Sequence, residues 1–178
     1  GYRREMTPPL LPVALTCGEP AGVGLELAEK AWSTLRDDLT FFLLADPAHL
    51  AGTVPFEVIQ TSAEASEVMP KALPVLAHSF DGDASLGHAD PANAKGVIEV
   101  IERGVQLVTD GEASAICTAP IHKKALKDGA EFPFPGHTEF LAHLAGVKRV
   151  VMMLACAELR VVPTTIHIPL KDVSTALT

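Results

Sequence analysis

The chain has 178 residues, of which 48% are hydrophobic and only 5% aromatic. It can therefore fill a sizeable, mainly aliphatic core, as one large domain or two small lobes. The net charge of −8 argues against a nucleic-acid partner, because phosphate neutralisation needs clustered lysine and arginine. The sequence has no run of about 18 apolar residues and no signal peptide, so we expect no membrane partner and a cytoplasmic location.

The three cysteines, Cys17, Cys117 and Cys156, are widely separated, and no two of them have metal-knuckle spacing. They lie in apolar, strand-like surroundings. We interpret them as free, buried thiols of a reducing compartment.

Apolar runs of strand length alternate with helical patterns along the chain. Strands are predicted at Val13–Thr16, Phe41–Ala45, Leu73–Ala77, Ala115–Thr118, Arg149–Leu154 and Leu159–Thr165. Helices are predicted at Glu26–Leu35, Ala92–Thr109 and His137–Leu144, with a capped start at Asp46-Pro47. The alternation favours an α/β fold with a mostly parallel sheet. About four residues join the last two strands, too few for a parallel crossover, so these two are predicted to be antiparallel.

The first candidate site segment, TCGEPAGVGLE, follows the first predicted strand, at the sheet edge where ligands of open α/β sheets bind. Gly18, Gly22 and Gly24 would let the backbone turn sharply and approach an anion at the helix start. Their spacing matches neither the dinucleotide nor the phosphate-loop fingerprint, so a plain tight turn is an equal alternative. Glu19 beside Pro20 indicates a carboxylate held in a fixed orientation.

The second segment, TAPIHKKAL, also follows a predicted strand. Thr118 is predicted to cap the next helix, with Pro120 near its first position. The cationic run His122–Lys124 would then crowd a helix start, where the macrodipole disfavours positive charge unless an anion is bound. A solvated charge cluster is the alternative, which we favour for Lys124 and Lys127.

The third segment, FPGHTEFLAHLAG, brings three polar side chains to the first turn of a helix. Thr138 is predicted to be the N-cap, and Glu139 would complement the helix dipole. Capping does not explain His137, for which a structural hydrogen bond and a functional role are equally good interpretations.

The fourth segment, VPTTIHIPL, places His167 at the end of the last predicted strand, before Pro169. A histidine at a strand end is a common metal ligand, although one histidine does not make a metal site. We interpret His49, His78 and His88 as surface or loop residues.

Taken in order, GEPAGVGLE, TAPIHKKAL, FPGHTEFLA and VVMMLACAELRVVPTTIHIPL resemble the 4-hydroxythreonine-4-phosphate dehydrogenase family of pyridoxal phosphate biosynthesis. The resemblance runs from about Val13 to the last residue. The family usually has proline where Leu25 stands, and often Thr-Thr-His where this chain has Thr165, Ile166 and His167.

The resemblance implies an α/β, isocitrate/isopropylmalate dehydrogenase-like fold in a truncated chain. Residues 1–5, which precede Met6, would be a tag remnant or a disordered N-terminus. Residues 6–178 would form the N-terminal part of a two-lobed α/β dehydrogenase, with the second lobe incomplete or absent. In agreement, the helical pattern of Lys171–Leu177 reaches the end of the sequence without a glycine cap.

The resemblance also implies the reaction, which is oxidation of the C3 hydroxyl of 4-phosphooxy-L-threonine by NAD with a divalent metal. Loss of CO2 would then give 3-amino-2-oxopropyl phosphate. His137 and Thr138 match the family's substrate-binding pair, and His167 matches the first of three metal-binding histidines. The metal would be zinc, cobalt, magnesium or manganese.

The resemblance further implies that the active site is shared in a homodimer, so that this fragment alone would be inactive. Apart from the resemblance, we interpret Lys123 as a candidate for electrostatic help with the phosphate or the developing oxyanion. Similarity to the GDGIGPE-type turn makes Gly18, Glu19, Gly22 and Gly24 candidates for cofactor binding. The alternatives are a relative acting on a four-carbon sugar-acid phosphate or a cyclic dihydrodiol carboxylate, and a catalytically incomplete binding fragment.

Overall fold

The computed structural model describes residues 10–165 and 168–177. The chain divides into two compact units, Gly1–Pro133 and Phe134–Thr178. The predicted N-terminal extension, residues 1–5, lies outside the described residues.

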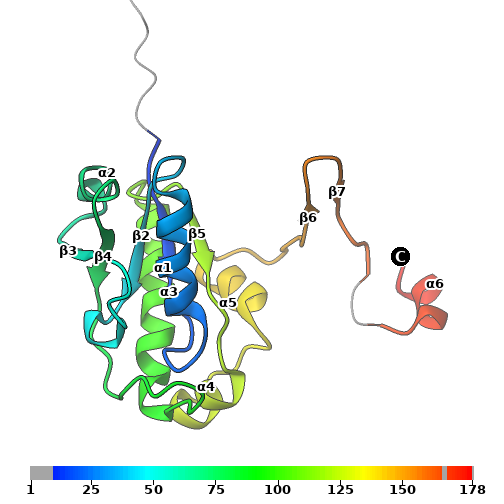
Figure 1. The fold of residues 1–178 in the computed structure, drawn as a ribbon. Helices are drawn as coiled ribbons and strands as arrows, with labels where there is room; N and C mark the ends of the chain where they lie inside the picture. The colour runs from blue at the N-terminus through cyan, green and yellow to red at the C-terminus, as the bar shows by residue number, and fades with distance from the viewer. Residues whose placement is uncertain (1–9, 166–167, 178) are drawn as a thin grey trace, which may run out of the picture. The chain divides into compact units, whose positions relative to one another are not determined.

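The first unit is built on a five-stranded parallel sheet with the order β3-β4-β2-β1-β5 (Figure 1). The strands are β1 (Val13–Thr16), β2 (Phe41–Ala45), β3 (Phe56–Ile59), β4 (Leu73–Ala77) and β5 (Ala115–Thr118). All four strands predicted for this unit are confirmed with their predicted bounds. The prediction missed β3, an edge strand whose first three residues are exposed, because it lacks a fully apolar run.

Helices connect these strands, and α4 (Lys123–Ala130) follows the last of them. The connecting helices are α1 (Gly24–Leu35), η1 (Pro47–His49), η2 (Ser62–Glu64), α2 (Ala65–Val68), η3 (Pro91–Asn93) and α3 (Ala94–Thr109). The two long helices, α1 and α3, each begin two residues from the predicted first residue. Asp46 caps η1 as predicted, since its side chain accepts a hydrogen bond from the backbone N–H of Ala48.

The long helices α1 and α3 cover opposite faces of the sheet. Gly104 of α3 lies against Ile116 and Leu44, whereas Ala28 of α1 lines the same apolar groove as Cys117. Ile116 and Cys117 are consecutive in β5, so their side chains point to opposite faces. Both faces are therefore apolar, which is why β2 is a continuous apolar run.

The second unit contains α5 (His137–Leu144), the antiparallel pair β6 (Leu154–Ala155) and β7 (Arg160–Val161), then η4 (Leu170–Asp172) and α6 (Val173–Ala176). The antiparallel pairing is confirmed, but both strands are much shorter than predicted. Their apolar residues, among them Val151, Met153 and Leu159, are exposed, so burial does little to extend the ladder.

The structure also tests the predictions for the cysteines and for membrane-spanning helices. Cys17 is buried as predicted, but Cys117 and Cys156 are exposed, so the interpretation of all three as buried thiols is wrong. Within the described ranges, no helix is both long enough and apolar enough to cross a membrane.

Candidate functional site

The segments that follow β1 and β5 lie in direct contact. The backbone N–H of Glu19 donates to the carbonyl of Pro120 at 2.9 Å, and Ala119 N–H donates to the carbonyl of Thr16 at 3.2 Å. The first two candidate segments are therefore neighbours at one edge of the parallel sheet.

Glycine is required in the first segment by the packing of the backbone. Gly18 has φ of +66°, and a Cβ there would stand 2.3 Å from the carbonyl oxygen of Pro120. A Cβ at Gly24 would stand 1.9 Å from the carbonyl oxygen of Cys17. Close approach of the two strand-end turns thus accounts for Gly18, and tight folding of the β1–α1 turn on itself accounts for Gly24, without a ligand.

Glu19 is held inside the same turn. Its side chain is buried, and Oε1 accepts a hydrogen bond from the backbone N–H of Ala21 at 3.1 Å. The fixed orientation predicted for this carboxylate is confirmed. This hydrogen bond joins two residues of the same turn, so Glu19 also stabilises the turn.

The second segment starts α4 in a way that differs from the prediction. Thr118 is the last residue of β5, and the N-cap of α4 is His122, whose Nδ1 accepts a hydrogen bond from Ala125 N–H at 3.1 Å. The predicted Thr118 cap is therefore wrong, because the helix begins five residues later.

Lys123 and Lys124 open α4, and both are exposed. Lys124 forms an ion pair with Asp128 one turn on, which agrees with its interpretation as a solvated charge. Within residues 10–165 and 168–177, Lys123 makes no ion pair.

The third segment begins α5 in the second unit. Gly136 is the N-cap and makes no side-chain capping bond, so the prediction that Thr138 caps the helix is wrong. His137 and Thr138 are the first two helical residues. Glu139 lies in the first turn, as predicted. The first-turn N–H groups of an α-helix have no partner within the helix, so this helix start favours an anion.

The predicted metal ligand His167 lies outside the described residues. Among the residues that are described, no group of three or more histidine, cysteine, aspartate or glutamate side chains could hold a metal ion. These residues alone do not fit a metal centre.

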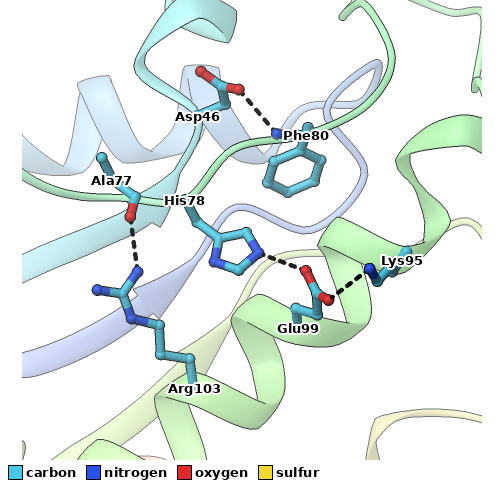
Figure 2. A network of polar contacts seen from close by, with 7 residues as sticks. All are labelled: Asp46, Ala77, His78, Phe80, Lys95, Glu99 and Arg103. Atoms are coloured by element: carbon cyan, nitrogen blue, oxygen red, sulfur yellow. Dashed lines mark hydrogen bonds and ion pairs between the residues drawn. The ribbon is translucent and has the colours of Figure 1, made fainter.

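A polar cluster between the end of β4 and α3 was not predicted (Figure 2). His78 Nε2 lies 2.9 Å from Glu99 Oε2, and Lys95 lies 3.5 Å from the other carboxylate oxygen. Arg103 donates to the carbonyl of Ala77 at 2.7 Å. The hydrogen bond from His78 is the main cause that lowers the pKa of Glu99. These contacts fasten the end of β4 to α3.

His78 lies in the loop after β4, as predicted, but its side chain is only 19% exposed and is paired with Glu99, which was not predicted. The signal that could have found it is its position directly after a predicted strand. Asp46 holds the same loop from the end of β2, since its Oδ2 accepts a hydrogen bond from the backbone N–H of Phe80 at 3.0 Å.

The family match and two similar proteins carry names from pyridoxal phosphate biosynthesis or its 4-hydroxythreonine-4-phosphate dehydrogenase. Residues 37–178 match the family described as pyridoxal phosphate biosynthetic protein PdxA. A 4-hydroxythreonine-4-phosphate dehydrogenase of Ruegeria sp. (strain TM1040) is 58% identical over 166 residues, covering 93% of this chain and 51% of that protein. The enzyme of the same name from Roseobacter denitrificans is 52% identical over 174 residues, covering 97% and 53%. The chain thus spans about half the length of the curated relatives it matches.

Solved structures support the same assignment. A 4-hydroxythreonine-4-phosphate dehydrogenase from Burkholderia phymatum superposes with a TM-score of 0.82 at 31% identity, covering 92% of this chain and 52% of that one. A terephthalate 1,2-cis-dihydrodiol dehydrogenase from Burkholderia xenovorans shares the fold, with a TM-score of 0.67 at 20% identity, 94% of this chain and 52% of that one. This chain belongs to the PdxA family of pyridoxal phosphate biosynthetic proteins, and it has their α/β dehydrogenase fold.

Proposed function

We propose that this chain is part of a homodimeric, cytoplasmic dehydrogenase that oxidises 4-phosphooxy-L-threonine with NAD. Carbon C3 gives its hydride to NAD and its hydroxyl gives a proton to solvent, which leaves a β-keto acid. The bond between C2 and the carboxylate then breaks, CO2 leaves, and C2 takes up a proton from solvent to give 3-amino-2-oxopropyl phosphate. The observation that carries the proposal is the 58% identity to a relative named 4-hydroxythreonine-4-phosphate dehydrogenase.

His137 and Thr138 would bind an anionic group of the substrate, its phosphate or its carboxylate. Support comes from their position as the first two residues of α5, where side chains and backbone N–H groups can donate to the same anion. A charged acceptor makes such hydrogen bonds roughly twice as strong as neutral ones, so losing one donor should weaken substrate binding measurably.

Lys123 would add positive charge for the phosphate or for the oxyanion that forms as the hydroxyl is oxidised. Its support is positional, because it is exposed at the start of α4 beside the β5 turn and makes no ion pair with the residues described. Lys124 is a matched control, since it is equally near the helix start but pairs with Asp128.

The cofactor would supply hydride acceptance, and the divalent metal would have His167 as one ligand. Both roles rest on membership of the family. In the β1–α1 turn, Gly18 and Gly24 are needed for packing, so changing them would disturb the fold as well as any cofactor contact. Gly22 is the better probe, because an added Cβ would come no closer than 3.2 Å to another atom, the carbonyl oxygen of Glu19.

The test uses the full-length protein and follows NADH absorbance with 4-phosphooxy-L-threonine and each divalent metal in turn. A four-carbon sugar-acid phosphate and a cyclic dihydrodiol carboxylate serve as competing substrates. We expect NADH and CO2 from the phosphothreonine only. NADH from a competing substrate, with none from the phosphothreonine, would refute the proposed reaction.

Variants of the same protein assign the residues. His137→Asn and Thr138→Ala should raise KM for the substrate about tenfold, the loss of about 1.4 kcal/mol that one charged hydrogen bond represents. Glu139→Gln, in the same helical turn, is the control and should leave KM unchanged. Lys123→Gln should lower kcat/KM while Lys124→Gln does not, and His167→Ala should raise the metal concentration needed for turnover. If Glu139→Gln raised KM as much as the His137 and Thr138 variants, or Lys124→Gln lowered kcat/KM as much as Lys123→Gln, the role assigned to those residues would be refuted.

A further inference from the structure

Strand β5 lies at one end of the sheet order but has the composition of an inner strand (Figure 1). It pairs with β1 on one side, and its sequence, Ala-Ile-Cys-Thr, contains no charged residue and no proline. Parallel sheets are normally covered on both faces, and natural edge strands carry charges or proline that prevent further pairing. An apolar and unprotected strand is therefore found where the described sheet ends.

The opposite edge of the sheet, β3, is protected in the usual way. Glu57 lies within β3, is exposed, and forms an ion pair with Lys71 at 3.7 Å. A charged residue on an edge strand makes the addition of another strand unfavourable. The two ends of the sheet thus differ, and only β3 has the features of a true edge.

The backbone of β5 is free to pair on its outer side. Ala119 N–H donates to the carbonyl of Thr16, which stands opposite Thr118 in the register. Successive residues of a strand direct their N–H groups to opposite sides, so Ile116 and Thr118 direct theirs away from β1. Within residues 10–165 and 168–177, no strand lies on that side of β5.

An apolar groove of about 320 Å³ lies beside β5 on the face that carries α1. Leu27, Ala31 and Leu35 follow one another at each turn of α1 and line it. Leu27 is 50% exposed and Leu35 is 38% exposed. A different stripe of α1 already packs into the core, namely Leu25, Ala28 and Trp32. A second apolar stripe on a helix indicates a second packing partner.

We propose that a strand and a helix from the part of the full-length protein outside these 178 residues cover β5 and this groove. The chain covers only 51% and 53% of two relatives, so enough polypeptide is available for both elements. The strand pairs with the outer side of β5, and the helix packs on the second stripe of α1. The remaining half of the protein therefore completes the first unit, in addition to any lobe of its own.

This covering has two consequences for the residues around the groove. Cys117 lines the groove and is exposed in the present chain, so it becomes shielded in the full-length protein. Thr118 and Pro120, from the second candidate segment, also line the groove. The covering segment therefore borders the edge of the sheet that carries the candidate site.

The first test measures amide hydrogen exchange by NMR in the full-length protein. The Ile116 N–H should exchange at least about a hundredfold more slowly than the Val58 N–H of β3. Val58 is the matched control, because Leu73 N–H donates to the carbonyl of Pro55, so Val58 directs its N–H away from β4. Both residues are β-branched and lie on an outer side of the same sheet. A smaller difference in rate would show that β5 is a free edge and would overturn the proposal.

The second test identifies what covers the groove. Photo-leucine, which has nearly the shape of leucine, is incorporated into the full-length protein and activated by light. We expect cross-links from Leu27 or Leu35 to peptides outside residues 1–178, in chains whose mass on a denaturing gel is unchanged. Cross-links from these leucines only in chains of doubled mass would show that a second copy covers the groove and would overturn the proposal. Cross-links confined to residues 1–178, or none, would overturn it as well.

Discussion

The backbone N–H of Glu19 donates a 2.9 Å hydrogen bond to the carbonyl of Pro120, joining the turn after β1 to the turn after β5. The same carbonyl oxygen lies 2.3 Å from the position a Cβ would take at Gly18. The two turns can approach this closely only if residue 18 has no side chain. The contact between the first two candidate segments therefore depends on a glycine at position 18.

Gly18→Ala should lower the free energy of unfolding by about 3 kcal/mol. The left-handed backbone at φ of +66° costs about 1–2 kcal/mol for a residue with a Cβ, and the clash with Pro120 adds about 1–3 kcal/mol. Chemical denaturation followed by circular dichroism measures the change.

Gly52→Ala is the matched control for backbone strain alone. Gly52 has φ of +70°, but an added Cβ would meet nothing within 4 Å. Its loss of stability should be about 1 kcal/mol. If the two variants lost the same stability, the clash with the Pro120 carbonyl would not limit the approach of the turns.

Much of the first unit could be predicted because its strands are buried on both faces. Phe41–Ala45 is apolar at every position, and all five residues are buried, so the run itself marks the strand and its ends. Edge strand β3 carries no such run, since Glu57 and its neighbours face solvent. The apolar residues 150–162 are mostly exposed in the second unit, so the apolar pattern there overstated the strands.

His122→Ala should destabilise α4 by about 1 kcal/mol, because Ala125 N–H then loses its acceptor. His122→Asn should keep the stability, since asparagine is among the best N-cap residues. Thermal unfolding of the two variants beside the parent chain measures this. A loss of equal size in both would mean that the imidazole has another role.

The three cysteines should differ in reactivity. Burial raises the pKa of Cys17 to about 12, so it carries almost no thiolate at about pH 8. A disulfide reagent should label Cys117 and Cys156 in the folded chain and Cys17 only after denaturant is added. Labelling of the Cys17→Ser variant is the control and should be unchanged in the folded state. Rapid reaction of all three thiols in the folded parent chain would contradict the burial of Cys17.

The candidate site was less predictable than the fold, because its contacts join residues distant in sequence. The pairing of His78 with Glu99 depends on the register between β4 and α3, which no local pattern encodes. The position of His78 after a strand was available, but its partner was not. The Thr118 and Thr138 caps failed for a different reason, since a threonine is compatible with the end of a strand or the second position of a helix as well as with a cap.

Because of Glu99, the free energy of unfolding of the first unit should fall at acidic pH. The hydrogen bond from His78 holds the pKa of Glu99 below its ordinary value of 4.5 in the folded chain. The folded state then binds the proton less readily than the unfolded state, so the paired carboxylate stabilises the fold above that pH. The stabilisation is lost as pH falls from 4.5 through the lower folded pKa.

Denaturant unfolding across this range should give a steeper loss of stability for the parent chain than for Glu99→Gln, which cannot titrate there. Glu26→Gln is the control, because its partner Lys30 is exposed and high salt should abolish any difference it makes. Parallel pH profiles for the parent chain and Glu99→Gln would show that the His78–Glu99 contact does not favour the ionised carboxylate.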